Sequence, residues 1–91
     1  MPYTVLVSKT FQKKFQKLSS SLKNKIKGTL KELQKDPHTS RPKCDIKILR
    51  DTHPQKHRLR IGRYRIIYLI NKDKVKIIDL IKREIGYSKI E

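Results

Sequence analysis

Residues 57–68, with the sequence His-Arg-Leu-Arg-Ile-Gly-Arg-Tyr-Arg-Ile-Ile-Tyr, contain the pattern that decides the fold. Before Gly62 arginine alternates with leucine and isoleucine, a period of two that is typical of a β-strand with two different faces, and after it comes a second strand-like run rich in isoleucine and tyrosine. Glycine allows the positive φ that a short hairpin needs, so Gly62-Arg63 predicts a tight turn. We therefore expect an antiparallel hairpin made of strands 56–61 and 64–71.

The flanking segments add two strands after position 44 and a helical region before it. Runs 45–49 and 74–82 predict strands, with a turn at 71–73, and the β-branched run 3–7 predicts another strand. Apolar residues recur at helical spacing in two segments, as Phe11, Phe15 and Leu18, and then as Leu22, Ile26, Leu30 and Leu33.

The ends of these two helices carry recognisable signals. Ser8 is a candidate N-cap, the serines at 19–21 separate the helices, and Asp36-Pro37 ends the second before a loop at 37–44. The order β-α-α-β-β-β-β predicts an α+β fold: a mainly antiparallel sheet with two helices on one face, in a single domain over residues 1–91.

The charge of the chain points to an anionic partner. Its 91 residues include 24 Lys and Arg but only 8 Asp and Glu, for a formal net charge of +16. Such a balance predicts binding to RNA, DNA, an anionic membrane or an acidic protein.

Composition also excludes several kinds of site. Cys44 is the sole cysteine, so neither an internal disulfide nor a cysteine-based zinc site is expected, and we expect no metal and no cofactor. The longest apolar run, 66–70, is far shorter than the ~20 residues of a membrane span. Residues 1–7 lack a basic leader, and a reduced, cytoplasmic setting fits best.

Arginine is concentrated in the hairpin, whereas lysine is dispersed. Four of the seven arginines lie between positions 58 and 65. Strand alternation places Arg58 and Arg60 on one face, and Arg65 shares the face of Ile67 and Leu69 on the neighbouring strand. If the helices cover the other face, the three arginines converge on an open surface, where planar guanidinium groups suit phosphate binding.

This hairpin, together with the order of elements and the ending that contains Arg83 and Tyr87, resembles the RelE/ParE family of small bacterial and archaeal toxins. The resemblance covers almost the whole chain. Its RelE branch implies an endoribonuclease that cleaves messenger RNA on the ribosome and is held inactive by an acidic, RelB-like antitoxin in a hetero-oligomer.

In that branch the RNA's own 2′-hydroxyl attacks the adjacent phosphate, a reaction that requires no metal ion. By position, the resemblance implies catalytic roles for the following residues: Arg58, Arg60, Arg65, Arg83 and Tyr87. We expect the neighbouring basic side chains to contact the nucleic acid, and these are Lys56, His57, Arg63 and Lys82.

Two positions depart from the RelE pattern. Arginine replaces lysine at both Arg58 and Arg60, and arginine is a poor general base. Either the reaction runs mainly on charge stabilisation, or another group takes the proton from the 2′-hydroxyl, with Lys56, His57 and Tyr87 as the candidates. Tyr87 also follows Arg83 by four residues, a spacing nearer to other branches of the family.

Less specific interpretations remain open. Arg58 and Arg60 are also consistent with a solvated strand face, and Arg65 with a side chain that covers the sheet edge. Arg83 and Tyr87 are consistent with a surface charge pair and a packed side chain, and alternation places His57, Tyr64 and Tyr68 toward the core. For the whole protein, the alternatives are a non-catalytic, ParE-like toxin that binds a topoisomerase, a decayed toxin, and a simple basic module that binds nucleic acid.

Overall fold

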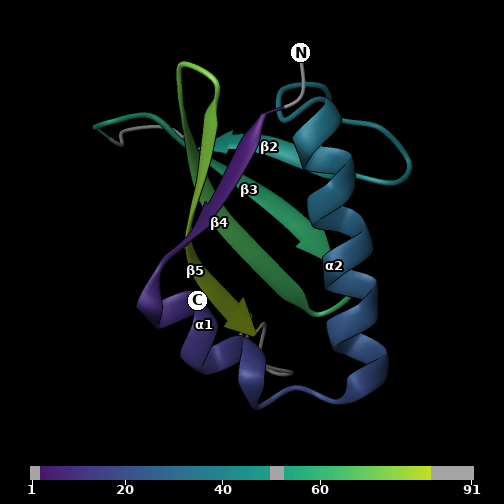
Figure 1. Cartoon of the computed structure of the whole chain (residues 1–91). Coiled ribbons are helices and arrows are strands. Elements are labelled where there is room, and N and C mark those ends of the chain that lie inside the picture. Colours follow the sequence, from purple (N-terminus) through teal and green to yellow (C-terminus); the bar gives the residue numbers. More distant parts are fainter. Residues whose placement is uncertain (1–2, 50–52, 83–91) are drawn as a thin grey trace, which may run out of the picture.

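The computed structural model describes residues 3–49 and 53–82, and their elements follow the predicted order (Figure 1). In chain order these are β1 (Thr4–Val7), α1 (Lys9–Gln16), α2 (Ser20–Lys35), β2 (Asp45–Leu49), β3 (Lys56–Ile61), β4 (Tyr64–Asn71) and β5 (Lys74–Lys82). The predicted bounds of the last four strands are confirmed. None of the helices formed by these residues has the length and apolar character needed to cross a membrane.

Serine side chains begin both helices. The Ser8 hydroxyl accepts a hydrogen bond from the backbone N–H of Phe11 at 3.0 Å, and the Ser19 hydroxyl accepts one from that of Leu22 at 3.2 Å. Each bond satisfies one of the N–H groups that a helix N-terminus leaves unpaired. The Ser8 hydroxyl also donates to the carbonyl of Ile78 at 2.6 Å, so the same side chain ties α1 to the sheet.

The five strands form one mixed sheet in the order β1-β5-β4-β3-β2. The pairs from β2 to β5 are antiparallel, as predicted, while β1 pairs with β5 in parallel. This parallel pair is possible because the helical hairpin and three strands separate β1 from β5 in sequence.

Both helices lie on the same side of the sheet in Figure 1, and the core fills the space between them and the strands. Ile26 and Leu33 of α2 are fully buried with Leu59 and Tyr68 of the sheet. The Tyr68 hydroxyl donates a 2.8 Å hydrogen bond to the carbonyl of Pro37, and burial raises the pKa of this hydroxyl. Among the residues that the structure describes, no helix covers the opposite face, which is therefore the one available to a ligand.

Candidate nucleic-acid interface

The β3–β4 hairpin sets the positions of the three arginines. Gly62 adopts a φ of 55°, the left-handed region that glycine enters without the steric cost borne by other residues. The resulting register pairs Arg60 with Arg65 and Arg58 with Ile67. Alternating residues such as Leu59 are buried on the helix-covered face, so the arginines face the other way.

We call Arg58, Arg60 and Arg65 the arginine cluster. Arg60 and Arg65 are directly opposed, and side chains opposed in this way have Cβ atoms ~4.5–5.5 Å apart. Like charges at this separation destabilise a sheet unless an anion lies between them. The opposed guanidinium groups thus form a site suited to a phosphate, which carries the charge and the acceptor oxygens that they require.

An acidic residue lies beside the cluster. Asp45 pairs with Arg60 across the β2–β3 ladder, and its Oδ1 lies 3.7 Å from Nη2 of Arg58. The Arg58 side chain is only 14% exposed, whereas that of Asp45 is 56% exposed. The Nε of Arg58 is buried and has no hydrogen-bond partner within residues 3–49 and 53–82. Arg58 therefore keeps donor capacity that its long contact with Asp45 does not satisfy.

The flanking basic residues differ in their accessibility. Lys56 precedes Arg58 by two positions on β3 and shares its face, while Arg63 is exposed in the turn and Lys82 is exposed at the end of β5. Lys56 therefore extends the face of the arginine cluster, and Arg63 lies at the turn of the same hairpin. Lys82 instead pairs with Tyr64, which packs against the core, so it does not share the face of the cluster.

His57 lies on the opposite, helix-covered face and is 6% exposed. Its ring stacks on Tyr68 with centroids 5.3 Å apart, and burial, followed by the charge of His38, lowers its pKa. A side chain in this position is not accessible to RNA, so the contact expected of His57 is not compatible with the fold. Alternation along the strand already favoured the core for this residue.

Other chemical groups are sparse in the described part of the chain. No three of its His, Cys, Asp or Glu residues lie together in an arrangement that could hold a metal ion. Cys44 is fully buried, and burial raises the pKa of its thiol. The predicted catalytic residues Arg83 and Tyr87 lie outside the described residues.

Comparison with known proteins identifies the family. The family described as "ParE toxin of type II toxin-antitoxin system, parDE" matches residues 5–87. The chain belongs to this RelE/ParE family of toxins. The resemblance seen in the hairpin sequence is confirmed. No curated protein sequence matched the toxin.

Solved structures share its fold. The archaeal RelE-RelB complex from Pyrococcus horikoshii contains a chain 30% identical to the toxin, covering 91% of the toxin and 97% of that chain, with a TM-score of 0.79. The RelB-RelE antitoxin-toxin complex from Methanococcus jannaschii contains a chain that is 27% identical to the toxin. The match covers 85% of the toxin and 88% of that chain, with a TM-score of 0.70. The RelBE2 complex from Mycobacterium tuberculosis, at 24% identity and a TM-score of 0.77, covers 91% of the toxin and 100% of that chain.

Asp45 is the residue at this interface that sequence reasoning missed. The signal was present, because antiparallel pairing of the predicted strands 45–49 and 56–61 with aligned ends places Asp45 opposite Arg60. Within the part of the toxin that the structure describes, this carboxylate is the acidic group that forms an ion pair with the arginine cluster.

Proposed function

We propose that the toxin is an endoribonuclease that cleaves messenger RNA on the ribosome without a metal ion. The observation that carries this proposal is the opposed pair Arg60 and Arg65, with Arg58 beside it, on the sheet face that no described helix covers. Clustered guanidinium groups supply the fixed positive charge that a five-coordinate phosphorane requires.

In the proposed reaction the 2′-oxygen attacks the adjacent phosphorus and loses its proton, while the bond to the 5′-oxygen breaks and that oxygen gains a proton. The products are a 2′,3′-cyclic phosphate and a 5′-hydroxyl. The need for a 2′-hydroxyl restricts the substrate to RNA. Arg65 and Arg60 stabilise the phosphorane, and Arg83 and Tyr87 are proposed, from the family resemblance, to act at the leaving oxygen and the neighbouring base.

Unless the reaction runs mainly on charge stabilisation, the proton acceptor is a residue other than arginine. With His57 buried, Lys56 and Tyr87 remain from the sequence analysis, and Asp45 joins them because its carboxylate lies beside Arg58. Replacing each in turn and measuring the pH dependence of cleavage distinguishes them, since loss of the true base lowers the rate and removes the rising limb of the profile.

We further propose that the toxin pairs with an acidic, RelB-like antitoxin. Two observations support this: the net charge of +16, and the similar toxin chains found in RelE-RelB complexes. A flexible acidic segment can cover a large basic surface and fold as it binds. We expect co-purification with an acidic protein encoded beside the toxin; good growth of cells that express the toxin alone would argue against this pairing.

The experiment that tests the activity is induction in cells followed by mapping of messenger RNA 5′ ends. Cuts at a fixed phase within reading frames, with 5′-hydroxyl termini, are the expected result. The match to a ParE family favours a second candidate, a toxin that binds a topoisomerase. That function predicts DNA damage and no new messenger RNA ends, an outcome that would overturn the ribonuclease proposal.

A further inference from the structure

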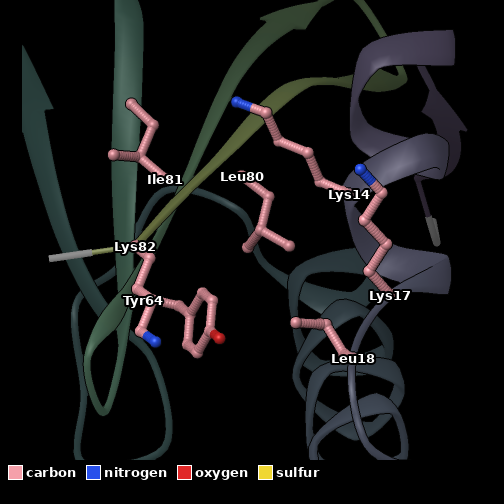
Figure 2. Close-up of a pocket in the computed structure, with 7 residues that line it drawn as sticks. All are labelled: Lys14, Lys17, Leu18, Tyr64, Leu80, Ile81 and Lys82. Atoms are coloured by element: carbon pink, nitrogen blue, oxygen red, sulfur yellow. The ribbon is translucent and has the colours of Figure 1, made fainter.

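A second basic site lies on the helix-covered face of the sheet, between α1 and strands β4 and β5. It is a pocket of about 330 Å³ (Figure 2). Its lining residues are Lys14, Lys17, Leu18, Tyr64, Leu80, Ile81 and Lys82. No role is given to this pocket by the reaction at the arginine cluster.

The pocket combines an apolar floor with a cationic rim. Leu80 is buried, and Tyr64 and Leu18 are partly buried against the core. Figure 2 shows the Tyr64 ring extending from the sheet toward the helical wall, with its hydroxyl at the far end. A planar heterocycle placed here would contact a tyrosine ring and leucine side chains, which is the environment that stacked bases use in single-stranded RNA sites.

Three ammonium groups surround this floor. Lys14 and Lys17 stand on the helical wall and Lys82 on the strand wall (Figure 2). Lys14 forms a 2.8 Å ion pair with Asp79, whereas neither Lys17 nor Lys82 has an ion-pair partner within residues 3–49 and 53–82. Lys17 and Lys82 are both exposed, so their charge is available to a phosphate.

The pocket and the arginine cluster lie on opposite faces of the same two strands, at the end where β3 turns into β4. Tyr64 pairs with Lys82, and the next residue, Arg65, pairs with Ile81. Because adjacent strand residues point to opposite faces, Tyr64 lies on the pocket side of the sheet and Arg65 on the side of the arginine cluster. The exposed Arg63 lies in the turn between the two sites.

We propose that this pocket is a nucleotide subsite, which binds the base and phosphate of an RNA residue flanking the phosphate held by Arg60 and Arg65. The inference rests on the proposed ribonuclease function. RNA is favoured over an acidic peptide because the pocket holds an aromatic ring as well as cations, and because Arg63 provides a cationic path to the cluster.

The test is binding of adenosine 5′-monophosphate to the full chain, followed in methyl NMR spectra. We expect the methyl signals of Leu18 and Leu80 to shift on titration. Lys17→Glu should weaken this binding about tenfold, the loss of one charge-assisted hydrogen bond. Lys31→Glu makes the same charge change on an exposed site of α2 outside the pocket and should leave the affinity within about twofold.

Equal weakening by Lys17→Glu and Lys31→Glu, or no shift at Leu18 and Leu80, would overturn the subsite. Shifts caused by a glutamate-rich peptide but not by the nucleotide would identify a protein-binding pocket and also overturn it. The two proposals can be tested independently. Shifted methyl signals in a protein that cleaves no RNA would overturn only the ribonuclease proposal, and RNA cleavage without shifted signals would overturn only the subsite.

Discussion

Arg65 lies directly across the hairpin from Arg60, on a face that carries no core residue of its strand. Its side chain is therefore placed to bind a ligand, and its positive charge opposes that of Arg60 when no ligand is present. The charge of Arg65 therefore favours ligand binding but lowers stability, and substituting this residue allows the two effects to be measured separately.

Arg65→Ala should lower single-turnover cleavage of ribosome-bound messenger RNA by ~10²–10³, as expected when a transition-state contact worth ~3–4 kcal/mol is lost. Arg65→Lys should recover only part of the rate, because a point charge replaces a planar fork. A thermal melt is the control, and the Ala variant should melt no lower than the parent because it relieves the repulsion with Arg60. Cleavage at the parent rate would show that the hairpin is not the active site.

His57 makes stability depend on pH. Burial lowers its pKa from an ordinary value of 6.5, so the unfolded chain binds a proton at a higher pH than the folded chain does. Stability should therefore be unaffected by this residue above pH 6.5 and decrease as the pH falls below it. Melting temperatures between pH 8 and 5 measure the effect.

Two variants isolate the contribution of this imidazole. His57→Phe keeps a ring against Tyr68 and should flatten the profile above pH 5. His53→Gln, at an exposed position, should leave the slope unchanged. A slope that His57→Phe does not alter would assign the pH dependence to other groups.

At the scale of elements, the two glycines described in the structure have opposite roles. Gly62 occupies the turn with φ 55°, while Gly28 is an exposed residue inside α2, and a Cβ at either position would meet no atom within 4 Å. The difference between them is thus one of backbone conformation alone.

Gly62→Ala should destabilise the protein by ~1–2 kcal/mol, the cost of a left-handed conformation, and Gly28→Ala should stabilise it by ~1 kcal/mol because alanine favours a helix. Urea unfolding of both variants gives the two values. Destabilisation by Gly28→Ala would contradict the argument that helix propensity alone decides the effect at this position.

The elements also differ in how well the sequence predicts them. Strands after position 44 were predictable because alternation and turn residues fix their ends, and the same alternation placed the arginine cluster. The side of the sheet to which β1 adds was not predictable, because a run such as Thr4–Val7 specifies a strand but not its neighbour. The bulge that pairs Ile67 with Asp79 and Tyr68 with Ile77, leaving Ile78 over, has no sequence signal either.

For the whole molecule, the net charge of +16 dominates encounters with anions. Affinity for RNA should fall steeply with salt, since each neutralised phosphate releases counterions. Arg65→Ala should reduce the slope of log affinity against log salt by about one unit, while most of the affinity remains. Fluorescence anisotropy with a labelled single-stranded RNA at several salt concentrations measures both quantities, and an unchanged slope would mean that Arg65 contacts no phosphate.

The pairing of β1 with β5 has a consequence for synthesis. Thr4 pairs with Lys74 and Val7 with Ile77. The first described strand therefore cannot pair with another strand until the last one, β5, has been synthesised. Because β5 also borders β4, the arginine-bearing hairpin lacks one flank until nearly all of the described chain has been translated. A nascent chain therefore cannot complete this sheet, and under the proposed function the arginine-bearing surface is not fully formed until synthesis of the toxin is almost finished.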